Sequence, residues 1–261
     1  MSEAWDPRQY ERFRDERAQP FFDLLAMVLP RPGMRAVDLG CGTGELTAHL
    51  HRTLACASTL GIDSSAAMLA AVPRDVPHLQ FQLSDIETFD AAGARFDLVF
   101  SNAAVHWVPD HPRLFARLTA LATDAGQIAV QMPANFDHPS HATAAEVAAE
   151  LPFAGALAGW QREVPVLAPE AYTDLLDKLG WRDIHVRLQV YAHHLDSREH
   201  VVEWVKGTLL TDYKKRLAPD LYARFLDEYR ARLIPRLEDR RPYLYTYKRI
   251  LMHATRRQAT G

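Results

Sequence analysis

The sequence predicts an α/β protein built on a doubly wound, mostly parallel sheet. Three observations predict it. Apolar, strand-like runs alternate with segments of helical periodicity along most of the 261 residues. Four of these runs carry an acidic or amide residue near their carboxyl end, and the first leads directly into alternate glycines. We expect seven strands with helices on both faces, and a hydrophobic content of 48% supplies the core.

The first strand is expected over Arg35–Leu39, and glycines follow at positions 40, 42 and 44. A helical pattern begins at Glu45, so the first N–H groups of that helix would point toward a ligand. Dinucleotide-binding turns read G-x-G-x-x-G, whereas this turn reads G-x-G-x-G, which argues against NAD. We therefore expect Gly40 and Gly42 to cradle an adenosyl cofactor. Asp38 would accept a hydrogen bond from a loop N–H or from the ammonium group of the cofactor.

Three later strands supply the other expected contacts with the cofactor, because open parallel sheets bind ligands at the carboxyl ends of their strands. Strand 59–63 ends in an acid placed for ribose hydroxyls, and strand 79–85 ends in one suited to an adenine amino group. Strand 96–102 ends in an amide expected near the sulfonium. The predicted contacts are Asp63 and Ser64, Asp85 with Ile86 beside the ring, and Asn102 with Ala103.

A simpler interpretation exists for each of these residues. A single aspartate at a strand end is more often a helix cap or a turn former than a ligand. Asp63 and Asp85 support cofactor binding only together with the glycine turn and in this order along the chain. Met68 is expected to pack in the core or to touch the cofactor.

The remaining elements continue the alternation. A helical stripe over 114–122 precedes a strand over 126–132, and a helix over 169–180 precedes a half-buried strand over 184–190. Asp196 and Glu199 resemble a capping box that begins a helix ending near Gly207. A second helix over 221–233 leads to a last strand over 243–254. Residues 196–242 would thus be a helical insertion, which is a natural lid.

Composition narrows the class of protein. A net charge of −3 gives no long-range attraction for nucleic acid. Cys41 and Cys56 make no disulfide framework, and the N-terminus lacks the pattern of a signal peptide, so we expect a cytoplasmic protein without a membrane span. We expect no metal site, because His193 and His194 should point to opposite faces of a strand and no ligand spacing occurs. The sequence indicates no obligate protein partner.

Several stretches resemble the trans-aconitate methyltransferases, within the S-adenosylmethionine-dependent methyltransferases with a Rossmann-like sheet. They are Trp5-Asp6-Pro7, the glycine turn, Ser101-Asn102-Ala103, Trp107-Val108-Pro109-Asp110-His111, Gln131-Met132-Pro133 and Val202-Glu203-Trp204-Val205-Lys206-Gly207-Thr208. The resemblance covers almost the whole chain. It implies one methyltransferase domain over 1–261, with a cofactor-covering helical region over 1–30 and lid elements over 133–165 and 196–242.

The resemblance also implies the reaction: methyl transfer from S-adenosylmethionine to a carboxylate of trans-aconitate or a similar small polycarboxylic acid, giving a monomethyl ester. Such a carboxylate has a pKa of about 4 and is already ionised, so positioning rather than a catalytic base carries the rate. The expected substrate contacts are His106, Trp107, His141, Lys206, Tyr213 and Arg249. Tyr10 and Arg17 would hold the cofactor from the N-terminal segment.

The chain departs from the family pattern at three positions that bear on the substrate. His106 replaces an expected glutamine, Thr211 an expected arginine and Lys248 an expected proline. A different small-molecule acceptor, methylated on oxygen or nitrogen, therefore stays open. Base methylation is disfavoured, because the fourth strand is followed by Asn102-Ala103-Ala104-Val105 instead of two prolines and an aromatic residue. A non-catalytic adenosyl-binding module is the other alternative.

Overall fold

The computed structural model describes residues 18–256, whose contacts divide them into two compact units. Unit 1 contains the described residues up to Pro133, then Pro165–Gln189 and the residues from Arg249 onward. Unit 2 contains Ala134–Val164 and Val190–Lys248. Tyr10, Arg17 and most of the predicted covering region 1–30 lie outside the described residues, and residues 18–25 are helical.

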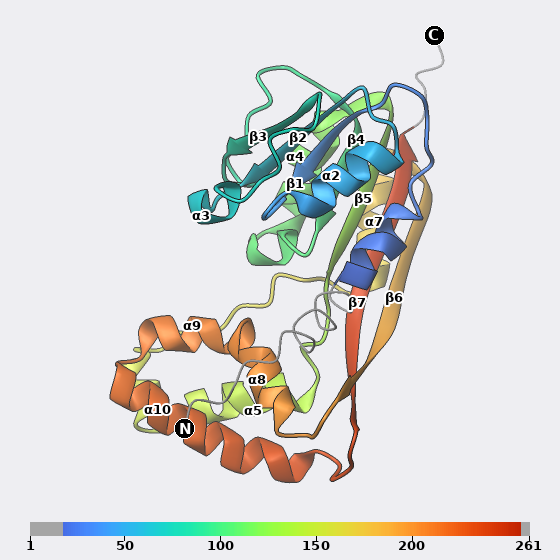
Figure 1. The fold of residues 1–261 in the computed structure, drawn as a ribbon. Coiled ribbons are helices and arrows are strands. Elements are labelled where there is room, and N and C mark those ends of the chain that lie inside the picture. The colour runs from blue at the N-terminus through green and yellow to red at the C-terminus, as the bar shows by residue number, and fades with distance from the viewer. Residues whose placement is uncertain (1–17, 257–261) are drawn as a thin grey trace. The chain divides into compact units, whose positions relative to one another are not determined.

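A seven-stranded sheet with the order β3-β2-β1-β4-β5-β7-β6 confirms the predicted fold class (Figure 1). Its strands are β1 (Arg35–Leu39), β2 (Ser58–Asp63), β3 (Leu79–Leu83), β4 (Phe96–Asn102), β5 (Ala122–Pro133), β6 (Trp181–Leu195) and β7 (Tyr243–Arg256). The first five pair in parallel, and β7 runs antiparallel to β5. The chain order reverses between β1 and β4, so their carboxyl ends form the switch point at which such sheets bind ligands.

Helices cover both faces of the sheet in unit 1 (Figure 1). The helical residues 18–25 and α2 (Glu45–Thr53) lie on one face, where Phe21 packs edge-on against Phe100 at 5.5 Å between ring centroids. Helices α4 (His111–Leu121) and α7 (Pro169–Lys178) lie on the other. Because both faces are covered, β1 is an almost continuous apolar run, and Val37 and Leu39 are completely buried.

Unit 2 is helical and has an aromatic core. Its helices are α5 (Pro139–Ala148), α6 (Phe153–Ala156), α8 (His200–Lys206), α9 (Leu209–Arg216), α10 (Pro219–Leu233) and the 3₁₀ turn η2 (Ile234–Arg236). The Phe225 ring stacks on Tyr213 at 4.8 Å and meets Phe153 edge-on at 5.3 Å. The segments predicted as lid elements are thus helical, and α8 to α10 lie between β6 and β7 in the chain as predicted. Their covering role stays a prediction.

The bounds of several elements differ from the sequence interpretation; the strand predicted over 184–190, for example, is the longer β6. Strand β5 begins at Ala122 rather than 126, because Ala122 pairs with Phe96 across a register shift that interrupts the alternation. Helix α8 begins at His200, and its N-cap Glu199 already has helical backbone angles and no side-chain cap. A capping box needs an extended N-cap residue, so Asp196 and Glu199 do not form one.

Within residues 18–256, no helix is both long enough and apolar enough to cross a bilayer. In the same range, no group of three or more His, Cys, Asp and Glu side chains is placed to hold a metal ion.

Candidate active site

The turn after β1 is fixed by hydrogen bonds to the end of β2. The N–H groups of Gly40 and Cys41 both donate to the carbonyl of Ile62, at 2.8 and 2.9 Å. The N–H of Gly42 donates to the Asp63 carboxylate at 2.9 Å. The protein's own contacts therefore hold the shape of the turn.

The three glycines of this turn have positive φ angles but different surroundings. A Cβ at Gly40 would lie 2.1 Å from the Cβ of Ala104, and one at Gly44 would lie 2.5 Å from the Phe81 ring. A Cβ at Gly42 would meet nothing within 4 Å. Gly40 and Gly44 are thus required by packing, whereas the space beside Gly42 is open. The open side fits a ligand that approaches the backbone there.

Asp38 lies beneath the turn and is only 4% exposed. Its Oδ2 accepts a hydrogen bond from the Thr47 hydroxyl in the first turns of α2, at 2.6 Å. The predicted loop N–H partner was wrong for the described structure, because the N–H groups of Gly40, Cys41 and Gly42 donate to residues of β2 and that of Gly44 donates to the Cys41 carbonyl. Burial raises the pKa of Asp38 to about 6, the Thr47 hydrogen bond opposes this rise, and the Asp63 charge adds to it. A cation near this carboxylate would be strongly favoured.

Asp63, the last residue of β2, and Asp85, just after β3, both accept hydrogen bonds that form turns. Asp63 accepts from Gly42 through Oδ2 and from the N–H of Ser65 through Oδ1, at 2.8 Å. Asp85 Oδ1 accepts from the N–H of Glu87 at 2.7 Å. These contacts match the simpler interpretation that the sequence left open. An ionised carboxylate offers about four acceptor positions, so both can also bind ligand hydroxyl or amino groups. Their ribose and adenine roles stay predictions.

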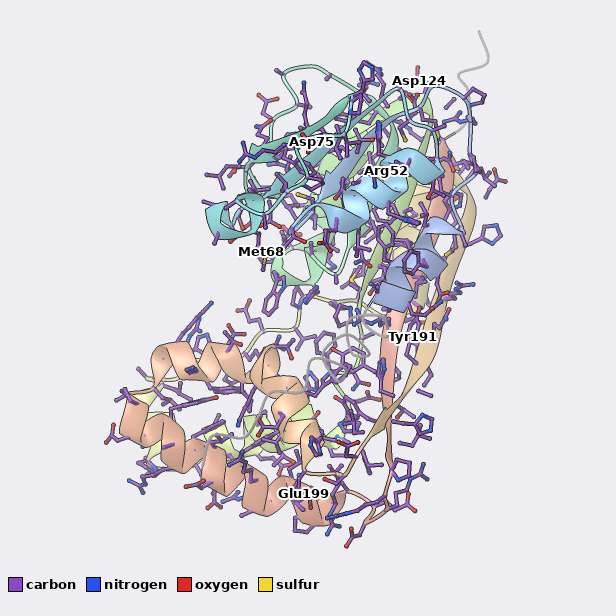
Figure 2. The ribbon with its side chains drawn as sticks, viewed as in Figure 1. Arg52, Met68, Asp75, Asp124, Tyr191 and Glu199 are labelled. Atoms are coloured by element: carbon purple, nitrogen blue, oxygen red, sulfur yellow. The ribbon has the colours of Figure 1, made fainter. Side chains whose placement is uncertain are left out.

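Apolar side chains near the turn differ in burial. Ile86 is half-buried, with its Cδ1 3.7 Å from the position of a Cβ on Gly40. Met68, on the short helix α3 (Ala66–Leu69), is 48% exposed and does not belong to the core (Figure 2). Ser64, which follows Asp63 in the chain, is exposed as well.

A polar chain joins the carboxyl ends of β4 and β5 to the middle of β7. Asn102 Oδ1 accepts from Gln131 Nε2 at 2.6 Å, and Gln131 Oε1 accepts from Arg249 Nη1 at 3.0 Å. The backbone of Gln131 also accepts the N–H of Ala103 at 2.9 Å, and Ala103 has a left-handed φ of 55°. Two predicted site residues, Asn102 and Arg249, are therefore connected through Gln131. The sequence patterns did not assign Gln131 a role.

The residues after β4 form a 3₁₀ turn, η1 (Val105–Trp107), which carries His106 and Trp107. Their rings lie 4.7 Å apart, and Trp107 is 53% exposed, so it is not a core residue. His111 Nε2 forms a hydrogen bond with the Val105 carbonyl at 3.1 Å, and its Nδ1 contacts the Tyr172 hydroxyl. Burial lowers the pKa of His111, which therefore supports this turn as a neutral side chain.

The other predicted substrate contacts belong to unit 2. Lys206 Nζ donates to both carboxylate oxygens of Glu203, at 2.7 and 2.8 Å, so its charge is paired. His141 is half-buried, and burial lowers its pKa to about 4. Tyr213 is 2% exposed. Arg249, His106 and Trp107 belong to unit 1.

A pocket of 350 Å³ in unit 2 contains an arginine that sequence reasoning missed. Its lining consists of Ala145, Ala148, Ala149, Ala154, Gly159, Trp160, Gln161, Arg162 and Tyr213. Arg162 Nε donates to Asp212 Oδ2 at 3.2 Å, and its side chain is 15% exposed. Burial has the largest effect in lowering the pKa of His141, and the charge of Arg162 has the next largest. Arg162 lies in an irregular segment, where no periodic pattern marks it.

Sequence comparison identifies the family. A profile described as "Methyltransferase domain" matches residues 10–186. A trans-aconitate 2-methyltransferase of Deinococcus radiodurans is 46% identical over 97% of this chain and 98% of its own length. One of Variovorax paradoxus is 40% identical over 88% of both chains, and one of Azoarcus sp. is 37% identical over 97% and 99%.

This chain belongs to the trans-aconitate 2-methyltransferase family. Solved structures of lower identity share its fold. The YcgJ protein of Bacillus subtilis superposes with a TM-score of 0.63 at 12% identity, covering 92% of this chain and 99% of that one. Phosphoethanolamine N-methyltransferase 2 of Haemonchus contortus, in complex with S-adenosylhomocysteine, has a TM-score of 0.54 at 17% identity and covers 92% and 52%.

The departures from the trans-aconitate methyltransferase pattern have defined surroundings. Thr211 Oγ1 donates to the Lys206 carbonyl at 3.2 Å, and the next residue, Asp212, binds Arg162. Lys248 Nζ contacts the Asp137 carboxylate, and this hydrogen bond lowers the pKa of Asp137. The chain therefore lacks the expected arginine at position 211. Its neighbour Asp212 instead binds a cation from a different segment, Arg162.

Proposed function

We propose that this chain transfers a methyl group from S-adenosylmethionine to a carboxylate of trans-aconitate or a closely related small polycarboxylic acid. The product is a monomethyl ester. The observation that carries the proposal is the glycine turn with its open side at Gly42. The chain that contains it matches trans-aconitate 2-methyltransferases over nearly its full length. Cys41 and Cys56 are free thiols, which fits a cytoplasmic enzyme.

The proposed cofactor contacts lie at or just after the carboxyl ends of the first four strands. Asp38 would face the ammonium group, Asp63 the ribose and Asp85 the adenine amino group. When bound, S-adenosylmethionine supplies an electrophilic methyl group. Because the accepting carboxylate is already ionised at neutral pH, the protein has to orient it and exclude water rather than remove a proton.

Binding a polycarboxylate requires cations for the carboxylates that do not react, since an unpaired buried anion is costly. Arg249 is the first candidate, because Gln131 ties its guanidinium to Asn102 at the end of β4. Arg162 is the candidate in unit 2, where it lines a pocket with Tyr213. We further propose that the helices of unit 2 cover the bound substrate.

A screen of small di- and tricarboxylates with isotopically labelled methyl donor, read by mass spectrometry, tests the proposal. We expect an ester of trans-aconitate and none of citrate. Esterification of another polycarboxylate alone would fit the changes at positions 106 and 211. Transfer only to an amine, a phenol or RNA would refute the proposal.

The role of Arg249 is tested by substitution. Arg249→Ala should raise KM for the accepting acid about tenfold or more, because a charge-assisted hydrogen bond is lost, and should leave affinity for S-adenosylmethionine unchanged. The exposed Arg224 on α10 provides the control, since Arg224→Ala removes the same charge from the surface. An unaltered KM in Arg249→Ala would exclude it as an anchor.

A further inference from the structure

Gln131 lies in β5 between two predicted site residues and is 1% exposed. In the sheet it stands directly opposite Asn102 of β4, and diagonally from Arg249 of β7, which pairs with Pro133. Its side chain lies within hydrogen-bond distance of both, at 2.6 Å from Asn102 and 3.0 Å from Arg249. The residues all belong to unit 1. A single buried amide therefore connects the two side chains.

The chemistry of the arginine fixes the direction of this chain of hydrogen bonds. A guanidinium has only N–H donors, so the atom of Gln131 that faces Arg249 must be its carbonyl oxygen. Its NH₂ group then faces Asn102, and the atom of Asn102 that accepts from it must be Oδ1. Because an amide is planar, Nδ2 of Asn102 is turned away from Gln131. It forms no hydrogen bond with any residue that the structure describes.

Asn102 lies beside the glycine turn. Phe100 pairs with Asp38 in the parallel strands β4 and β1, so Asn102, two residues further on, is level with Gly40. Asn102 is half-buried, and the strand order reverses between these two strands, where such sheets bind ligands. The amide therefore presents N–H donors at the ligand-binding edge of the sheet.

We propose that Gln131 is a positioning residue that holds the Asn102 amide as a hydrogen-bond donor for a carboxylate of the accepting acid. This role rests on the proposed function. A sulfonium or an ammonium group is a cation and would require the amide oxygen, which is turned toward Gln131. A carboxylate accepts from N–H donors, and the charge of Arg249 at the other end of the chain favours the same ligand. Asn102 is thereby assigned to the acid and not to the sulfonium that the sequence predicts beside it.

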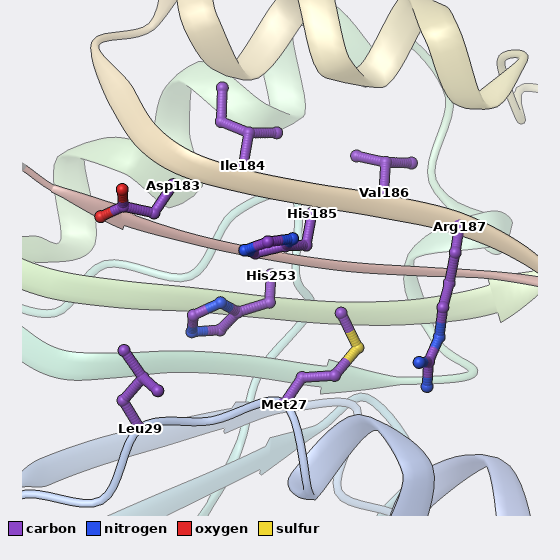
Figure 3. A pocket seen from close by; sticks show the side chains of 8 residues that line it. All are labelled: Met27, Leu29, Asp183, Ile184, His185, Val186, Arg187 and His253. Atoms are coloured by element: carbon purple, nitrogen blue, oxygen red, sulfur yellow. The ribbon is translucent and has the colours of Figure 1, made fainter.

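A second buried glutamine of β5 supplies a control. Gln127 is 2% exposed and also bonds to β7, where His253 Nε2 lies 2.9 Å from its Oε1. His253 lines a groove of 530 Å³ beside β6 (Figure 3). Gln127 pairs with Leu98, near the amino end of β4, whereas Gln131 pairs with the last residue of that strand. The two glutamines thus share strand and burial, but only Gln131 contacts the ligand-binding edge.

The first experiment replaces the donor by an acceptor. In Asn102→Asp, Gln131 can still donate to Oδ1, and a second carboxylate oxygen stands where the NH₂ group was. We expect KM for the accepting acid to rise about tenfold or more, because two carboxylates then face each other. The affinities for S-adenosylmethionine and S-adenosylhomocysteine should stay close to their wild-type values.

The two cofactor forms differ in the charge on sulfur, so their affinities show which group Asn102 faces. Tighter binding of S-adenosylmethionine alone in Asn102→Asp would place the residue beside the sulfonium and overturn the proposal. Weaker binding of both forms with an unaltered KM for the acid would assign the donor to the carboxylate of the cofactor, which also overturns it.

The second experiment tests whether Gln131 acts through Asn102. Gln131→Met keeps the length of the side chain, removes both hydrogen bonds and should raise KM for the acid about tenfold. In an Asn102→Ala background, the same substitution should raise KM about threefold or less, because the group that it positions is gone. Gln127→Met is the matched control and should leave KM unchanged. Binding of S-adenosylhomocysteine shows that each variant is folded. An undiminished effect of Gln131→Met in the Asn102→Ala background would overturn the positioning role.

The wild type separates this role from the proposed function. If it esterifies no acid, both are wrong. If it esterifies one and Asn102→Asp leaves KM unaltered, the reaction stands and only the role of Asn102 and Gln131 is refuted.

Discussion

At the scale of single residues, Asp38 is a buried carboxylate next to the glycine turn. Burial disfavours its charged form, and the Thr47 hydroxyl only partly opposes this effect. A ligand ammonium group would remove much of the penalty. The residue therefore costs stability without a ligand, and it would contribute affinity if the proposed contact with the cofactor ammonium forms.

The pKa of Asp38 predicts how that cost depends on pH. Its pKa rises from 3.8 to about 6 on folding, so the penalty is absent below the lower value and complete above the higher one. We therefore compare the unfolding free energy of Asp38→Asn with that of wild type, both without cofactor. This difference should shift in favour of the variant by about 2 kcal/mol when the pH rises from 4 to 8. Urea unfolding at the two pH values measures the gain. A difference that does not vary with pH would show that Asp38 is not penalised by burial.

At the scale of elements, the three glycines of the turn differ in whether a neighbouring side chain occupies the position of a Cβ. Gly40 and Gly44 have neighbours where a Cβ would stand, and Gly42 has none. The same G-x-G-x-G pattern therefore contains two glycines that the fold requires and one whose open side fits a ligand. Substitution by alanine should distinguish them.

Gly40→Ala should destabilise the protein by roughly 3 kcal/mol, because a left-handed φ and a methyl clash with Ala104 add together. Gly42→Ala should lower stability by only roughly 1 kcal/mol, from its φ angle alone. Relative to this small loss of stability, it should weaken binding of S-adenosylmethionine more than Gly40→Ala does. Urea unfolding and titration calorimetry give the two quantities. Equal stability losses would mean that the turn relaxes around the new methyl groups.

The pocket between α5, α6 and α9 makes a second prediction for elements. If Arg162 binds a substrate carboxylate, Arg162→Ala should raise KM for the accepting acid about tenfold or more, with unchanged affinity for S-adenosylmethionine. Steady-state kinetics with Arg224→Ala in parallel check this. Loss of affinity for the cofactor, or a wild-type KM, would mean that Arg162 does not bind the substrate. Its role would then be to stabilise unit 2 through its bond with Asp212.

At the scale of the whole molecule, the division into two units bears on the proposed lid. If unit 2 covers the substrate, S-adenosylhomocysteine and trans-aconitate together should slow amide hydrogen exchange in 134–164 and 190–248. S-adenosylhomocysteine alone should protect mainly the residues around the glycine turn. Mass spectrometry of peptides from the three states measures both effects. Protection confined to unit 1 in the ternary state would argue against a lid.

Much of the fold was predictable because its signals are local. Periodicity located the strands, and the acids and glycines at their ends needed only the order of a doubly wound sheet to predict one ligand-binding edge. The start of α8 was misplaced because Glu199 takes helical angles within a turn, which its residue type does not reveal. Only its exposure excluded the core alternative for Met68, and its contact with the cofactor stays a prediction.

The sequence by itself determined the class of fold, the glycine turn and the acids near the ends of its first strands, since each depends on neighbours in the chain. Tertiary structure alone decided which side chains meet. Arg249 and Gln131 bond across 118 positions, and Arg162 and Asp212 across 50. Such contacts depend on topology, because residues far apart in the chain become neighbours only when the sheet and the helices have packed.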